Sequence, residues 1–122
     1  KASPPPGLVA AIGPQVVTFE PGQTIMPGVT SVEVRGHTPG HCSFLHESSG
    51  VLITGDSITN FFTLMRYSPA YFCSDITASR ETADRLGEVD YEVAAFTHGP
   101  EIREHARERV RTFLSRRQTR LR

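Results

Sequence analysis

The sequence predicts a mixed α/β fold, with one mixed sheet that carries helices on one face. Short apolar segments bounded by Pro-Gly or glycine turns predict strands at residues 15–19, 23–27, 30–36, 42–47, 51–55 and 92–97. Two further segments, 77–87 and 101–118, carry helix signals. At 122 residues the chain is long enough for one domain or part of one, and we treat 1–122 as a single domain.

The strand patterns predict different degrees of burial. The segment "CSFLHE" (42–47) alternates, as a half-buried strand does, and "SSG" (48–50) predicts a hairpin turn after it. The segment "VLITG" (51–55) is a continuous apolar run, which is typical of a covered strand, and "EVAAFT" (92–97) predicts another short, buried strand.

The two predicted helices have recognisable ends. The first starts at Asp75 or Thr77 and stops at Gly87. The second follows Pro100, a good first-turn residue, and its apolar stripe predicts that it is the better packed helix. Three consecutive prolines make residues 1–7 a loop or the end of a linker.

Composition excludes some classes of function. Thirteen basic and thirteen acidic residues cancel, so no global field selects nucleic acid or an acidic membrane. No apolar run approaches the roughly 20 residues of a membrane-spanning helix. We expect Cys42 and Cys73 to be free thiols in a reducing, cytoplasmic compartment. The chain opens at Lys1 and not at Met, which leaves a start further upstream open.

Three residues of metal-ligand type share one placement. His41, Asp56 and His98 each stand just past a predicted strand and beside a glycine, which permits a sharp turn. Loops at strand ends are where α/β proteins build their sites. Two imidazoles and one carboxylate suit zinc, or iron or manganese. A structural role for each residue stays open on spacing alone.

A fourth histidine, His37, lies four residues before His41. Helical spacing would put both rings on one face, but Pro39 and Gly40 between them break a helix. The pair therefore belongs to a tight turn, which excludes the helical two-histidine metal motif.

The stretches "GHTPGHCSFL", "VLITGDSI" and "FTHGPEI" resemble the third, fourth and fifth metal-binding motifs of the metallo-β-lactamase superfamily. The resemblance implies the second, C-terminal half of a four-layer αββα sandwich. It also implies two zinc ions, with His41 on the first, His98 on the second, and Asp56 as the catalytic bridging ligand. His37 would brace the loop by a hydrogen bond without binding metal.

Two departures from the family pattern shape the implied function. The opening motif His-x-His-x-Asp-His is absent, so the metal site of this chain is incomplete. Asp56 stands where antibiotic-hydrolysing zinc lactamases carry a cysteine, which directs the interpretation to the glyoxalase, lactonase and general hydrolase branch. The Gly-Cys-Gly-Arg signature of glyoxalase II is missing too. We expect hydrolysis of a small ester, thioester, lactone or phosphodiester through a metal-activated water, with this chain inactive alone. Whether the chain is itself an enzyme stays open.

The half-fold interpretation also predicts a partner. An uncovered sheet face would pair with the missing N-terminal half or with a second copy, giving a homodimer. One alternative is a non-catalytic self-associating module or vestigial protein. A second is a nucleic-acid-binding module that uses the eight arginines of residues 101–122. Apart from Phe113 of the apolar stripe, no aromatic residue interleaves with these arginines, which makes nucleic acid the weaker alternative.

Overall fold

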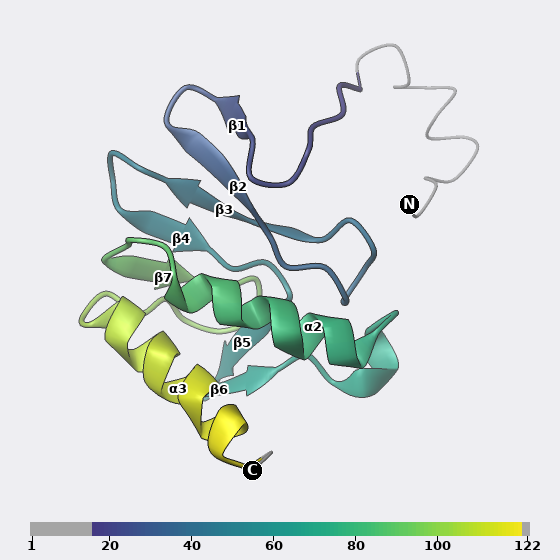
Figure 1. Ribbon diagram of the computed structural model, residues 1–122. Coiled ribbons are helices and arrows are strands. Elements are labelled where there is room, and N and C mark those ends of the chain that lie inside the picture. The colour runs from purple at the N-terminus through teal and green to yellow at the C-terminus, as the bar shows by residue number, and fades with distance from the viewer. Residues whose placement is uncertain (1–15, 121–122) are drawn as a thin grey trace.

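The computed structural model describes residues 16–120, as a five-stranded mixed sheet with a separate two-stranded hairpin (Figure 1). The large sheet has the order β1-β2-β3-β4-β7. Its strands are β1 (Thr24–Met26), β2 (Val29–Glu33), β3 (Cys42–His46), β4 (Val51–Ile53) and β7 (Val93–Ala95). The hairpin consists of β5 (Ile58–Phe61) and β6 (Leu64–Tyr67). The predicted α/β class is thereby confirmed.

The helical elements are the 3-10 turn η2 (Ala70–Phe72), the helix α2 (Ile76–Thr82), the 3-10 helix η3 (Ala83–Gly87) and the helix α3 (Ala106–Arg120). Of these, α3 packs against η3 and β7 (Figure 1). Asp75 caps α2, because its carboxylate accepts a hydrogen bond from the backbone N–H of Ala78 at 2.9 Å. The predicted helix 77–87 is therefore present, but its second half tightens into 3-10 geometry.

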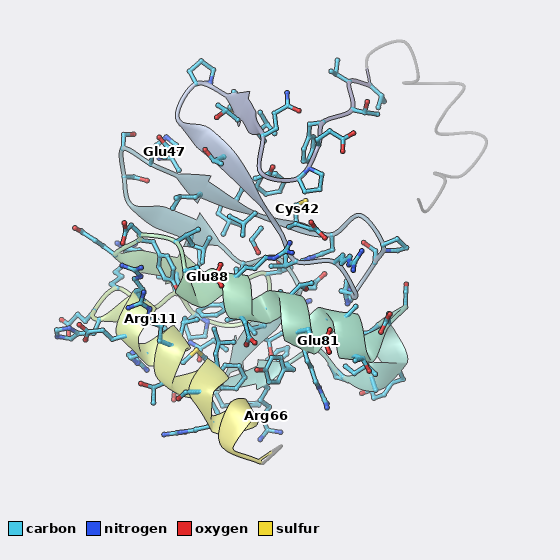
Figure 2. The ribbon with its side chains drawn as sticks, viewed as in Figure 1. Cys42, Glu47, Arg66, Glu81, Glu88 and Arg111 are labelled. Carbon is cyan, nitrogen blue, oxygen red and sulfur yellow. The ribbon has the colours of Figure 1, made fainter. Side chains whose placement is uncertain are left out.

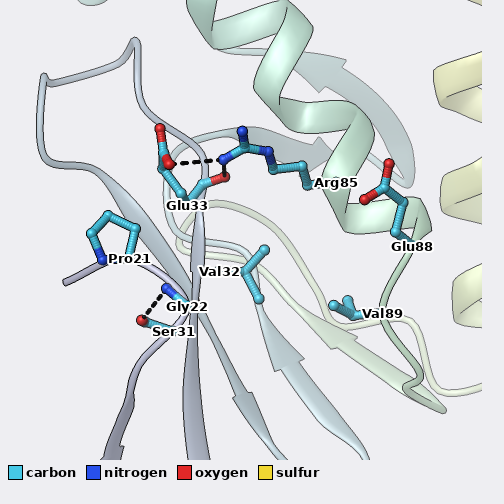
Figure 3. Close-up of a pocket in the computed structure, with 8 residues that line it drawn as sticks. All are labelled: Pro21, Gly22, Ser31, Val32, Glu33, Arg85, Glu88 and Val89. Carbon is cyan, nitrogen blue, oxygen red and sulfur yellow. Dashed lines mark hydrogen bonds and ion pairs between the residues drawn. The ribbon is translucent and has the colours of Figure 1, made fainter.

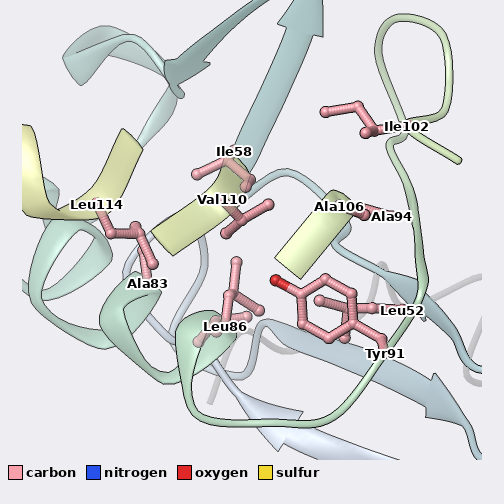
Figure 4. Packing of buried hydrophobic residues seen from close by; sticks show 11 residues of the cluster. Leu52, Ile58, Ala83, Leu86, Tyr91, Ala94, Ile102, Ala106, Val110 and Leu114 are labelled. Atoms are coloured by element: carbon pink, nitrogen blue, oxygen red, sulfur yellow. The ribbon is translucent and has the colours of Figure 1, made fainter. Parts of the chain in front are cut away.

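The core forms between the helices and one face of the sheet. In the sheet, Leu45 pairs with Leu52, and Leu52 pairs with Ala94 across the parallel β4–β7 contact. Leu52 and Ala94 are fully buried with Leu86 of η3 and Val110 of α3 (Figure 4). Burial of such side chains stabilises the fold by about 25 cal/mol per Å² of apolar surface. The helices are thus held by the sheet face that carries Leu52.

The opposite face of the sheet is only partly covered. Strand alternation places Phe44 and Ile53 there, opposite each other in the β3–β4 pair. Phe19 packs edge-on against Phe44, with ring centroids 6.2 Å apart. Ile53 nevertheless keeps 46% of its surface exposed. This face therefore retains apolar surface in contact with solvent.

The final helix starts later than its pattern predicts. Residues 101–105 are not helical, and α3 begins at Ala106. Ile102 instead exchanges two backbone hydrogen bonds with Ala94, at 3.0 and 2.9 Å, which requires an extended backbone. His105 precedes the helix with a φ of 52°. Ile102 is buried as predicted, but as an extension of the sheet.

Several predicted strands extend beyond the observed strands, and the sequence did not predict one element. Residues 16–19 of the predicted strand 15–19 form no regular structure. The strands predicted at 30–36 and 51–55 end early, at Glu33 and Ile53, because turns with positive φ at Gly36 and Gly55 follow. The β5–β6 hairpin had no sequence signal. Residues 1–7 lie outside the described part of the chain.

Some arginines of α3 have partners within the chain. Arg111 reaches from α3 and donates from Nε to the carbonyl of Gly87 at 2.6 Å (Figure 2). Arg107 pairs with the carboxylate of Asp90. These contacts fasten α3 to the end of η3, and they leave fewer free cations on this helix for a phosphate backbone.

The contact of Gly36 with α2 generates a prediction about stability. A Cβ at Gly36 would lie 2.1 Å from the backbone nitrogen of Ser79, and the φ of 130° is already costly for other residues. Gly28 has a φ of 79° with open space around it. We expect Gly28→Ala to lower the free energy of unfolding by about 1–2 kcal/mol. Gly36→Ala should add an overpacking cost of about 1–3 kcal/mol. Denaturant unfolding measures the free energy of unfolding of both variants. Equal losses of stability would contradict the close contact between Gly36 and Ser79.

The partly covered sheet face generates a prediction about assembly. We expect the chain to self-associate through this face, because burial of the exposed apolar surface there is favourable. Sedimentation or light scattering over a dilution series should show a mass above that of the monomer. Ile53→Lys should shift the chain toward monomer. Tyr71→Lys, an equally drastic change at an exposed residue of η2, is the matched control. A wild-type monomer at all concentrations would refute the expectation.

Candidate metal centre

Four residues of interest meet at one edge of the large sheet. His37 follows β2, His41 precedes β3, Asp56 follows β4 and His98 follows β7. Because β2, β4 and β7 run in the same direction, their carboxyl ends share this edge. The structure therefore brings together all the residues that the sequence singled out.

The carboxylate of Asp56 lies between two imidazole rings. Asp56 Oδ2 is 3.3 Å from Nε2 of His37, and Oδ1 is 3.2 Å from Nε2 of His98. The His37 and Asp56 side chains are mostly buried, whereas the His98 side chain is about half exposed. Oδ1 of Asp56 is buried, and its contact with His98 lacks the geometry of a hydrogen bond. Each carboxylate oxygen thus faces one imidazole nitrogen.

His41 lies next to these side chains and contacts the backbone of Asp56. Its Nε2 accepts a hydrogen bond from the backbone N–H of Asp56 at 2.9 Å. Its ring stands edge-on to the ring of His37, with centroids 5.5 Å apart. Gly55 makes this approach possible, since a Cβ there would lie 2.7 Å from the His41 ring. His41 therefore fixes the loop that carries Asp56.

The environment of His41 also shifts its proton affinity. Burial lowers the pKa of His41 below its usual 6.5, and the neighbouring His37 acts in the same direction. The Asp56 carboxylate opposes the shift to a smaller extent. A neutral ring is the form that can accept the Asp56 N–H, so burial favours the observed hydrogen bond.

The loop of His98 is held by the hairpin. The backbone N–H of Asn60 donates to the carbonyl of His98 at 2.9 Å, and the Asn60 side chain donates to the carbonyl of Pro100 at 2.9 Å. A Cβ at Gly99 would lie 2.1 Å from the carbonyl oxygen of Asn60. The ring of Phe61 stacks on that of His98, with centroids 5.7 Å apart. The hairpin thus sets both the backbone and the ring plane of His98.

The spacing of the ligand atoms fits metal ions. Zinc binds imidazole nitrogen and carboxylate oxygen at about 2.0–2.2 Å, so two ligand atoms of one tetrahedral ion lie roughly 3.3 Å apart. The His37–Asp56 and His98–Asp56 pairs match that separation. The unsatisfied Oδ1 of Asp56 is a second observation of the kind that a bound cation explains.

The described residues do not complete such a centre. Between residues 16 and 120, no group of three or more His, Cys, Asp or Glu side chains is arranged to hold one ion. The geometry instead places one imidazole nitrogen beside each carboxylate oxygen of Asp56, which makes two donor atoms for each possible ion. Further ligands would have to come from elsewhere, or from water.

Two surface hollows lie apart from this centre. The smaller, of about 230 Å³, lies between β2 and η3, where Glu33 and Arg85 form an ion pair at 2.9 Å (Figure 3). The larger, of about 420 Å³, lies between the hairpin and α3 and includes Met65 and Phe113. Neither includes the histidines or Asp56.

Sequence reasoning missed three contributors to the centre. They are Phe61, which stacks on His98; Ser68, whose hydroxyl donates to the carbonyl of Asp56; and Cys73, whose sulfur lies 3.9 Å from Nδ1 of His37. None stands in a metal-ligand motif, and all three depend on contacts between segments that are distant in the sequence. Both Cys42 and Cys73 are free thiols, as predicted.

The fold agrees with the comparison to known families. The model of the metallo-beta-lactamase superfamily matches residues 5–98, and the chain belongs to this superfamily. None of the curated proteins matches the chain. Within the described residues, no helix is both long and apolar enough to span a membrane.

Solved structures of the superfamily share the fold. A metallo-beta-lactamase family protein, TTHA1429, from Thermus thermophilus is 24% identical with a TM-score of 0.58, over 84% of this chain and 35% of that one. A beta-lactamase domain protein from Burkholderia ambifaria is 22% identical with a TM-score of 0.64, over 93% and 35%. TTHA1623 in a di-iron-bound form is 26% identical with a TM-score of 0.58, over 80% and 48%. The chain thus spans about a third to a half of the length of these proteins.

The buried position of His41 generates a prediction about pH. Because folding lowers its pKa below 6.5, the contribution of neutral His41 to stability is complete above pH 6.5. It is lost as pH falls through the lowered pKa. In metal-free chain, His41→Gln should keep an acceptor for the Asp56 N–H and flatten this part of the pH dependence. Denaturant unfolding at several pH values measures the slope. His46→Gln, a change at an exposed histidine, controls for the loss of an imidazole. If the stability of His41→Gln depends on pH as steeply as that of wild type, His41 is not the group responsible.

Proposed function

We propose that this chain contributes metal ligands to a hydrolase centre, through His41, Asp56 and His98. The observation that carries the proposal is the convergence of these residues: Nε2 of His98 lies 3.2 Å from Oδ1 of Asp56, and Nε2 of His41 lies 2.9 Å from the backbone nitrogen of Asp56. Asp56 would supply the carboxylate, and His41 and His98 would supply imidazole nitrogens. Membership of a superfamily of metal-dependent hydrolase fold supports this use of the site.

This proposal keeps the roles that the resemblance implies for the two histidines of the turn. His41 would bind metal, and His37 would brace the loop by a hydrogen bond. Nε2 of His37 lies 3.3 Å from Oδ2 of Asp56, where a ring N–H can donate to the carboxylate. Nε2 of His41 lies 2.9 Å from the backbone nitrogen of Asp56, so its ring stands beside the same loop.

The chemistry of a bound ion suits hydrolysis. Divalent ions in such sites lower the pKa of a coordinated water and polarise a carbonyl or phosphoryl oxygen. Residues of this chain would orient that chemistry: Asp56 holds its carboxylate in place through both its backbone groups, and Phe61 fixes the ring plane of His98. Zinc, iron or manganese fits the nitrogen and oxygen donors. The di-iron form of TTHA1623 supports iron as one candidate.

The rest of the centre would come from outside the described residues. We infer that the missing N-terminal half, or a second copy of the chain, supplies ligands, because this chain spans only part of its relatives. The substrate would be a small ester, thioester, lactone or phosphodiester. The free thiols of Cys42 and Cys73 support a reducing, cytoplasmic setting.

A metal-binding experiment separates the two role assignments. We expect weak binding of zinc or iron to the isolated chain, because each ion finds two ligands here. Loss of a ligand in His41→Ala, His98→Ala or Asp56→Asn should weaken binding by more than the roughly 10–100-fold expected for loss of an outer partner. His37→Gln should stay within that range. Titration calorimetry measures all four variants. Strong loss in His37→Gln with retention in His41→Ala would exchange the two roles.

A further inference from the structure

A surface groove lies between the β5–β6 hairpin and α3, on residues that the candidate centre does not use. It has a volume of about 420 Å³ and is lined by residues 63–65 of the hairpin and by one face of α3. Tyr67 of β6 packs on Phe113 of α3, with ring centroids 4.8 Å apart, which holds the two walls together. Small-molecule sites measure about 300–1,000 Å³, whereas a stable protein interface needs about 800 Å² on each partner. The groove therefore fits a small molecule.

Part of the groove is apolar. Met65 and Phe113 are partly buried and pack against the core, and Leu64 keeps 51% of its surface exposed. A methionine side chain adapts its shape to different apolar groups. An apolar chain that covers these three side chains would remove their surface from water, which is favourable.

Two arginines of α3 line the same groove. Arg109 and Arg116 are seven residues apart with Phe113 between them, so the three side chains share one face of the helix. Both arginines are exposed. In the part of the chain that the structure describes, neither guanidinium pairs with a carboxylate, whereas that of Arg107 pairs with Asp90. The groove thus offers two cations that have no anion within the chain.

The charges of the groove favour a single anion. Among the described residues that line it, Glu108 is the one acid, and its Oε2 lies 3.3 Å from Nδ1 of His105. Two arginines and one glutamate leave one net positive charge. A nucleic-acid strand suits the groove less, because it carries a charge on every nucleotide and stacks on free aromatic rings, whereas Phe113 already packs on Tyr67. A small ligand with one anionic group is the better complement.

The hairpin joins this groove to the loop of His98. Its turn residues, Phe62 and Thr63, have left-handed φ angles of 51° and 60°, and Thr63 lines the groove. Just before the turn, the N–H of Asn60 donates to the carbonyl of His98 at 2.9 Å, and the ring of Phe61 stacks on its imidazole. A ligand that contacts both the hairpin and α3 stabilises the arrangement in which both walls are in place. That arrangement also holds His98.

We propose that the hairpin–α3 groove binds a small amphipathic molecule with one anionic group, such as a medium-chain carboxylate, and that the hairpin transmits this binding to His98. The apolar chain lies on the three apolar side chains, and the anion accepts hydrogen bonds from Arg109 or Arg116. Neither the site nor its link to His98 rests on the metal-binding function proposed above.

The first test titrates the metal-free chain with decanoate, below its micelle concentration, in a calorimeter. We expect saturable binding of one decanoate per chain and no comparable binding of decylamine, which carries the opposite charge. The double variant Arg109→Gln/Arg116→Gln should bind decanoate about tenfold more weakly, as loss of a charge-assisted hydrogen bond predicts. The matched control is Arg35→Gln/Arg103→Gln, which removes two exposed arginines outside the groove and should bind as wild type does.

Two single variants locate the binding on the surface. Leu64→Asp places a negative charge in the groove at an exposed position and should abolish decanoate binding. Ile53→Lys changes the partly covered sheet face and should leave it unchanged. Loss of binding in Ile53→Lys, equal weakening in the two double variants, or equal binding of decylamine would overturn the site. Binding of a single-stranded oligonucleotide through Arg109 and Arg116, with none of decanoate, would overturn it in favour of nucleic acid.

The second test follows the imidazole signals of the metal-free chain by NMR during the same titration. The signals of His98 should shift in step with decanoate binding, while those of His46, in β3, stay in place. Leu64→Asp should remove the shift. Unchanged His98 signals at saturation, or equal shifts of both histidines, would overturn the transmission through the hairpin.

Discussion

The parallel pairing of β4 with β7 is the constraint on which the rest of the molecule depends. Leu52 faces Ala94 in this pair, and the N–H of Thr54 continues it by donating to the carbonyl of Ala95 at 2.9 Å. The pairing buries Leu52 and Ala94 under the helices and brings the loops of Asp56 and His98 to the same edge. A slip by one residue would turn the buried side chains to the other face and shift one ligand by about 3.3 Å relative to the other.

Most of the site could be predicted from the sequence because its residues occupy strand ends. A strand end is a local feature, marked by an apolar run and a following glycine, and parallel strands bring such ends together. The contacts of His37 and His41 with Asp56 could not be predicted in this way. They depend on the turn at Gly36, which has a φ of 130° and packs against the backbone of Ser79 in α2. A contact between segments that lie 43 residues apart leaves no trace in local spacing.

The β5–β6 hairpin escaped prediction for a related reason. Its turn residues, Phe62 and Thr63, have φ angles of 51° and 60°, where hairpins usually place Asn or Gly. The left-handed conformation costs about 1–2 kcal/mol per residue, so local preference opposes this turn. Contacts outside the hairpin compensate for that cost, among them the hydrogen bonds of Asn60 to the His98 loop and the packing of Tyr67 on Phe113. The same contacts position His98, which links the strained turn to the centre.

The candidate centre combines firm backbone support with poorly satisfied side-chain atoms. Both backbone groups of Asp56 are hydrogen-bonded, to His41 and Ser68, whereas the buried Oδ1 lies 3.2 Å from Nε2 of His98 without hydrogen-bond geometry. A poorly satisfied buried acceptor costs up to about 1–3 kcal/mol. Stacking on Phe61 holds the ring plane of His98, which limits how far this contact can improve. A cation beside the carboxylate, as in the function proposed above, would satisfy Oδ1 instead. This conflict between local satisfaction and overall geometry is typical of a site shaped for a bound group.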